Sequence, residues 1–287
     1  MNLGRLARYL IGFGATTLVG GLVDAHWGCV KAQGRLDAHY RASLGGVPLG
    51  SGTWVVDVHE DQFTASMSGG TTGILRLFAK GRGTSSVRGT VSQGQPTAVS
   101  YESSIQTDKK YDEVQMVLNG GTVKEYAAEP PTILTPDRVP VTDAHRRGIT
   151  DPMTASLIRV SGNGDTFSPE ACQRKLAIFD GRMRYDLRLA FKRLDKVRSE
   201  RGYQGTVVVC AVYFSPVAGH IPQRPVIKYL ADLHDIEVWL APISGTRLMA
   251  PYRVSVPTPL GMGVLEATQF VSVPYPAAAA SNAVRSH

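Results

Sequence analysis

The chain has 287 residues, of which 43% are hydrophobic and 19% charged, with a formal net charge of +7 and a mean hydropathy of −0.08. This composition is typical of a globular protein, and it excludes a disordered chain or a bundle of membrane-spanning helices. Thirty glycines and seventeen prolines argue against an all-helical fold, because both residues interrupt helices.

The first 32 residues have the features of a secretory signal peptide. Arg5 and Arg8 precede fifteen uncharged residues, Tyr9 to Val23, a run too short to span a membrane. We expect cleavage after Ala32; cleavage after Ala25 or retention as an uncleaved anchor are the alternatives. The sequence therefore predicts a periplasmic protein without a transmembrane span in its mature form.

Removal of residues 1–32 takes away three basic residues and one acidic residue, which leaves a net charge of +5. The remaining basic residues are scattered along the chain, whereas proteins that bind nucleic acid usually gather them on one face or helix. We therefore expect no nucleic-acid partner.

Cleavage after Ala32 also leaves two of the three cysteines, Cys172 and Cys210. In an oxidising compartment, two cysteines most simply form one disulfide, and we predict that they do. The alternative is a pair of buried thiols, because Cys210 follows the apolar run 207–209.

Alternating apolar and polar residues predict strands along most of the mature chain. The pattern is clearest at 35–44 and 182–192, and Asn119-Gly120 and Asp180-Gly181 are typical of tight turns. Further strands are predicted at 54–58, 63–67, 114–118, 208–214, 238–240, 252–256 and 264–273. Regularly spaced strands with short turns predict a mainly β, antiparallel fold, with residues 33–273 as a single domain.

Helices are predicted to be few and short. The candidates are 71–78, the segment 150–158 with a cap residue and a proline at its start, and 225–233. The proline-containing stretch 129–149 is predicted to be a long surface connection, and 274–287 a loose C-terminal tail.

Familiar catalytic motifs are missing from the sequence. It has no lipase-type Gly-x-Ser-x-Gly and no P-loop, and its histidines lack the spacing of metal ligands. Gly81-Arg82-Gly83 begins like a dinucleotide-binding loop but lacks the third glycine. We therefore predict no catalytic residues, no metal and no cofactor.

One polar cluster is a weak candidate site. Asp143 and His145 have the chemistry of an acid–base pair, Arg146 and Arg147 that of an anion clamp, and Asp151 follows closely. The alternative interpretation is a solvated loop that leads into a capped helix.

Several stretches resemble the bacterial family of unknown function DUF3108. They are the run 179–187 (Phe-Asp-Gly-Arg-Met-Arg-Tyr-Asp-Leu) with Cys172 upstream, the Asp151-Pro152 helix start, the strand 237–241 and the approach 258–261 to the last strand. The likeness covers roughly residues 35–273.

This resemblance implies an exported envelope protein with a long, strongly curved antiparallel sheet wound around a helix. The chain is also similar in layout to the alphaproteobacterial envelope-integrity protein B family, which implies a periplasmic β-spiral, like a half-open barrel, with one disulfide. The cysteine role transfers to Cys172 and Cys210, and no catalytic residue transfers.

The leading functional hypothesis is a non-enzymatic periplasmic protein that supports envelope integrity and binds a hydrophobic ligand or a lipoprotein on the concave face of the sheet. Five aromatic residues are candidates to line that cavity, or alternatively to fill a closed core: Tyr40, Trp54, Phe63, Tyr185 and Trp239. Two rival hypotheses are a scaffold that recruits periplasmic protein partners, and a hydrolase of envelope glycan or lipid that uses Asp143, His145 and Asp151.

Overall fold

The computed structural model describes residues 33–72, 80–162 and 164–275. The predicted signal peptide lies outside the described residues. So do most of the predicted helix 71–78 and most of the predicted tail. At the C-terminal end of the described part, Tyr275 donates a hydrogen bond from its hydroxyl to the carboxylate of Asp57.

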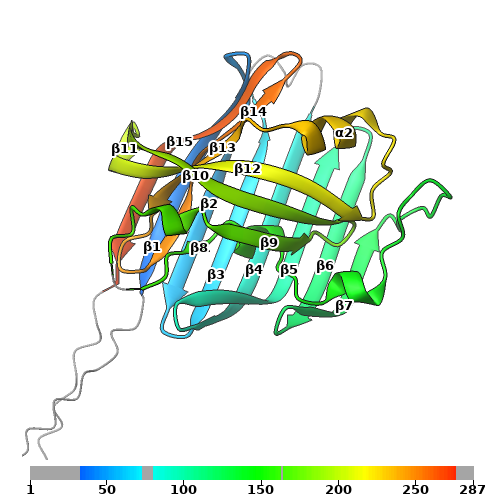
Figure 1. Ribbon diagram of the computed structural model, residues 1–287, viewed down its shortest axis with the longest axis horizontal. Helices are drawn as coiled ribbons and strands as arrows, with labels where there is room; N and C mark the ends of the chain where they lie inside the picture. Colours follow the sequence, from blue (N-terminus) through cyan, green and yellow to red (C-terminus); the bar gives the residue numbers. More distant parts are fainter. Residues whose placement is uncertain (1–32, 73–79, 163, 276–287) are drawn as a thin grey trace, which may run out of the picture. The chain divides into compact units, whose positions relative to one another are not determined.

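The first seven strands form an antiparallel meander in which each strand pairs with the next (Figure 1). Tight turns join most of them, as the Asn119-Gly120 signal predicts, and Gly120 has a positive φ of 53°. Their bounds are β1 (Gly34–Leu44), β2 (Val47–His59), β3 (Gln62–Thr71), β4 (Gly81–Ser92), β5 (Gln95–Thr107), β6 (Tyr111–Asn119) and β7 (Thr122–Glu129).

The second half of the chain extends the same sheet from its other side, because β15 pairs with β1. Its strands are β8 (Ile158–Arg159), β9 (Arg174–Phe179), β10 (Arg184–Arg198), β11 (Arg201–Gly202), β12 (Gln204–Ala218), β13 (Ile236–Pro242), β14 (Leu248–Thr258) and β15 (Gly261–Pro274). The strand order is β7-β6-β5-β4-β3-β2-β1-β15-β14-β13-β12-β10-β9, with β8 beside β14 and the short β11 parallel to β15. The predicted mainly β fold with one long antiparallel sheet is confirmed.

Helices in the described residues are short. They are α1 (Pro152–Ala155), α2 (Pro225–Asp232) and the 3-10 turns η2 (Asp143–Arg146) and η3 (Pro169–Ala171). Two of the three predicted helices, those starting near 150 and 225, are therefore present. No helix in the described part of the chain is long and apolar enough to cross a membrane.

The sheet curves until its second half crosses over its first. Figure 1 shows β10 and β12 running across β3 to β6, and the main core lies between these layers. In this core Trp54 and Val87 of the first half share one cluster with Val207 and Val209 of β12. The helix α1 contacts β4, β5 and β9, so it lies inside the curve.

A second, smaller core lies on the opposite face of β12. Val208 and Val212 pack there with residues of β13 and of the segment 158–172, and α2 packs against its rim. A strand buried on both faces needs apolar residues at consecutive positions, which explains the unbroken run from Val207 to Val212.

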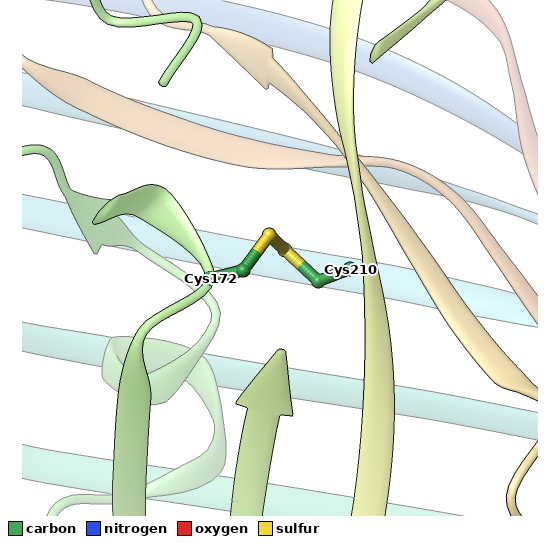
Figure 2. Close-up of a disulfide and its surroundings, with 2 residues drawn as sticks. All are labelled: Cys172 and Cys210. Atoms are coloured by element: carbon green, nitrogen blue, oxygen red, sulfur yellow. A yellow bond between two sulfur atoms is a disulfide. The ribbon is translucent and has the colours of Figure 1, made fainter. Parts of the chain in front are cut away.

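The predicted disulfide is present in this second core. Cys172, at the C-terminal end of η3, is bonded to Cys210 of β12, and both residues are fully buried (Figure 2). Their Cα atoms are 5.5 Å apart. The bond holds the segment that precedes β9 against the face of β12.

Candidate binding groove

A row of glycines crosses the inner face of the first meander, the face that bears the main core. Gly52 of β2, Gly69 of β3 and Gly83 of β4 are direct cross-strand neighbours, and we call them the glycine row. Tyr40 of β1 flanks the row on one side and Ile105 of β5 on the other. Four interstrand spacings separate β1 from β5, so the backbones at these two residues are about 19 Å apart along the sheet.

The glycine row forms the floor of an apolar groove of about 580 Å³. Met67, Ile105 and Leu265 line it and are 40%, 53% and 37% exposed, although they belong to the inner face. Its volume lies within the range of about 300–1,000 Å³ that is usual for small-molecule sites. The groove is thus a hollow in the sheet whose apolar lining is open to solvent.

The groove arises because inner-face side chains become smaller along each strand. In β2 the inner face changes from the buried Val56 and Trp54 to Gly52 and Gly50. In β4 it changes from Val87 through Ser85 to Gly83. One half of each strand therefore contributes to the core, and the other half leaves the space above it empty.

Among the described residues, the inner-face side chains that line the groove are uncharged. Arg82 is the one charged residue among its described lining residues; because it alternates with Gly81 and Gly83, its side chain lies on the outer face of the sheet, where its Nε donates to Gln106 at 3.0 Å. The groove therefore suits an apolar chain.

The five aromatic candidates lie in three different environments. Trp54 and Phe63 are 2% exposed and fill the main core. Tyr40 lies between core and groove, and its hydroxyl donates to the carbonyl of Pro251 at 2.6 Å.

The other two aromatic candidates are outside the lining of the groove. The ring of Tyr185 packs against Phe214, with 5.6 Å between ring centroids. The ring of Trp239 lies between the guanidinium groups of Arg193 and Arg253, and its indole N–H donates to Glu237 at 2.9 Å.

The three polar candidates are engaged separately. Asp143 is exposed and pairs with Arg146 at 3.3 Å, while His145 Nδ1 accepts the backbone N–H of Thr142 at 3.1 Å. Asp151 is fully buried, and its Oδ1 accepts the N–H groups of Met153 at 2.9 Å and Thr154 at 3.0 Å. Each of the three thus has a local structural partner at the end of a short helix.

The sequence interpretation missed the glycines that form the groove. Gly81-Arg82-Gly83 was interpreted only as an incomplete dinucleotide-binding motif, yet it is part of β4. The informative signal was the two-residue spacing in Gly50-Ser51-Gly52 and in Gly81-Arg82-Gly83, because alternate residues of a strand share one face.

The comparisons with known proteins agree with the fold-level resemblance. A family model described as a protein of unknown function (DUF3108) matches residues 39–268. The chain belongs to the DUF3108 family. No curated protein and no solved structure matches it.

Two of the stretches that carry the DUF3108 resemblance, the helix start and the run 179–187, meet in space. The N–H of Thr150 donates to the carbonyl of Ala177 at 2.8 Å, and the N–H of Phe179 donates to the carbonyl of Thr150 at 3.0 Å. The start of α1 is therefore attached to β9, directly before the turn at Asp180-Gly181.

This turn also attaches the second half of the DUF3108 sheet to the first. Asp180 Oδ1 accepts the backbone N–H groups of Arg182 at 2.8 Å and Met183 at 2.7 Å. The side chain of Arg182 pairs with Asp112 of β6 at 3.2 Å and donates to the carbonyl of Pro130 at 3.0 Å. The motif residues thus fasten the crossing strands to β6 and to the segment after β7.

Buried acids gather near this junction. Burial raises the pKa of both Asp151 and Asp180. Burial also raises the pKa of Tyr101 to about 12 and that of Tyr185 in the same direction, and the charges of the two aspartates add to both shifts. An ionised carboxylate at this position costs stability.

Asp151→Asn is expected to raise the melting temperature at pH 7, because an asparagine oxygen still caps α1 without a buried charge. Burial raises the pKa of Asp151 above 3.8, so between that pH and the higher pKa of the folded state the folded protein holds a proton that the unfolded chain has lost. Its contribution to stability therefore falls as pH rises through this window. In thermal melts from pH 4 upward, the melting temperature of the variant should fall less with rising pH than that of the wild type.

Asp151→Ala is the matched control for the cap. It removes the charge and also the acceptor for Met153 and Thr154, which should cost about 1–2 kcal/mol. Equal stability of the alanine and asparagine variants would contradict a capping role. If the melting temperature of Asp151→Asn fell with rising pH as steeply as that of the wild type, the result would contradict a destabilising buried charge at Asp151.

Proposed function

We propose that this DUF3108 protein is exported to the periplasm and supports the cell envelope without catalysis, by binding the acyl chain of a lipid or of a lipoprotein in the groove. The observation that carries the proposal is the apolar groove over the glycine row. Export is supported by the signal-peptide features of residues 1–32 and by the Cys172–Cys210 disulfide.

An acyl chain fits the lining of the groove better than a compact polar ligand does. Each buried methylene contributes about 0.8 kcal/mol, so a chain laid across the groove gains affinity from area alone.

Gly83→Leu should weaken acyl-chain binding at least tenfold and leave the fold intact. A Cβ added at Gly83 would lie 3.5 Å from the carbonyl oxygen of Ser104 and 3.7 Å from Cγ1 of Ile105, which are ordinary contacts. A leucine there would occupy groove volume, and displacing two methylenes costs about 1.6 kcal/mol, or more than tenfold in affinity. Titration with a fluorescent fatty acid measures the change.

Thr90→Leu is the matched control, because Thr90 is exposed on the same strand and is not among the described lining residues. It should bind the fluorescent fatty acid as the wild type does. Unchanged affinity of a folded Gly83→Leu variant would reject the groove as the binding site. Native mass spectrometry of protein purified from its own periplasm should release a lipid on organic extraction, and a clean unliganded mass would count against the acyl-chain proposal.

A further inference from the structure

Two arginines come together beside the hairpin turn between β4 and β5, away from the groove. Arg159 ends the two-residue strand β8, and Arg174 begins β9. The side chain of Arg159 lies over this turn, since a Cβ added to Gly94 would be 3.0 Å from its Nε. Arg174 lines a cleft with residues 95–98, which follow that turn.

Neither arginine has an acidic partner among the described residues. The guanidinium of Arg174 makes no hydrogen bond and no ion pair there, and the side chain of Arg159 has only a 3.5 Å contact with Ser161. The Nε atoms of both are buried and unbonded. By contrast, Arg193 pairs with both Asp195 and Glu237.

The two positive charges act on each other. Burial lowers the pKa of Arg174, and the charge of Arg159 lowers it further. Partly buried cations of like charge without a counter-charge are unfavourable, and an anion between them removes the penalty. The two guanidinium groups therefore lack a counter-anion among the described residues.

The cleft beside Arg174 has the size and lining to admit such an anion. Its volume is about 380 Å³, and its described lining has no acidic side chain. Thr97 and Thr150 are hydroxyl-bearing residues of its lining, while Leu157 and Leu176 form part of its apolar wall. Hydroxyls and guanidinium groups are the usual donors to phosphate oxygens.

We propose that a phosphate group binds beside this cleft, held by Arg174, which lines it, and by Arg159, which lies over the adjoining turn. Two guanidinium groups match the charge of a phosphate or phosphate monoester, about −1.5 to −2 at pH 7. Guanidinium groups also present paired donors that fit two phosphate oxygens. The apolar wall leaves room for an organic substituent on the phosphate.

The test is thermal denaturation of the disulfide-bonded mature protein at constant ionic strength, with inorganic phosphate or phenyl phosphate exchanged for chloride. Phosphate at ten times its dissociation constant should raise the melting temperature of the wild type by about 3–5 °C. Arg174→Gln should lose this rise, and in phosphate-free buffer it should melt no lower than the wild type. Arg88→Gln, which changes an exposed arginine of β4, should keep the rise.

An absent rise in the wild type, or an equal rise in Arg174→Gln, would overturn the proposal, because phosphate would then act elsewhere or not at all. The two probes also distinguish the sources of the phosphate. Saturation by phenyl phosphate at a lower concentration than inorganic phosphate supports an organic phosphate held against the apolar wall. Equal saturation supports free phosphate.

Discussion

Cys172→Ser is expected to lower the melting temperature of the oxidised protein by about 10 °C. The disulfide joins residues separated by 38 positions, and the chain-entropy model gives about 4 kcal/mol for closing a loop of that length. For a domain of this size, 1 kcal/mol corresponds to about 2–4 °C. Calorimetry of the variant and the wild type, both prepared under oxidising conditions, measures the difference.

Reduction provides an independent control for the same bond. Dithiothreitol should lower the melting temperature of the wild type to near that of Cys172→Ser and should leave the variant unchanged. The double variant Cys172→Ala/Cys210→Ala tests whether a lone buried thiol at Cys210 adds to the loss. If neither reductant nor substitution moves the melting temperature, the two cysteines are unpaired thiols in the folded protein.

The location of the disulfide explains why its loss should affect more than one contact in the second core. Cys172 lies in the segment that covers the second face of β12, where Val208 and Val212 are buried. Release of this segment would expose a strand that is apolar on both faces. The bond thus fastens this layer to β12 at η3, which is a three-residue turn.

The sequence predicted the strands whose inner face carries large apolar residues. β1 was placed within one residue of its bounds, because alternation such as Leu36, Ala38 and Tyr40 is unambiguous, whereas β10 was predicted to end at 192 and extends to 198. The strands β4, β5, β7 and β9 and the two-residue strands β8 and β11 were not predicted. In β4 the inner face carries Gly81, Gly83 and Ser85 at one end, so the alternation signal disappears where the groove is formed.

The candidate site was harder to predict than the fold, for a related reason. A groove depends on which small residues become neighbours across strands, and sequence spacing alone does not fix the register between Gly52 and Gly69 or between Gly69 and Gly83. Large aromatic residues were predicted as candidates to line the cavity, yet Trp54 and Phe63 are too well buried to contact a ligand. The proximity of Arg159 to Arg174 also depends on tertiary structure, which sequence spacing does not fix.

Gly181→Ala is expected to destabilise the protein by about 3–4 kcal/mol, with a fall in melting temperature of about 10 °C. Gly181 has a φ of +91°, which L-residues rarely adopt. A Cβ there would lie 2.2 Å from Cγ1 of Val114, a core residue of β6 that is 4% exposed. The β9–β10 turn rests on β6 at this contact, beside the pairing of Arg182 with Asp112.

Gly120→Ala separates the two sources of this cost. Gly120 also has a positive φ, +53°, but no atom lies within 4 Å of an added Cβ, so the change should cost only the backbone strain of about 1–2 kcal/mol. The double variant Gly181→Ala/Val114→Ala should cost less than the sum of its single variants, because the smaller side chain makes room for the new methyl group. If Gly181→Ala is no less stable than Gly120→Ala and shows no coupling to position 114, the turn does not rest on β6, and the crossing strands must be held to the first half of the sheet by other contacts.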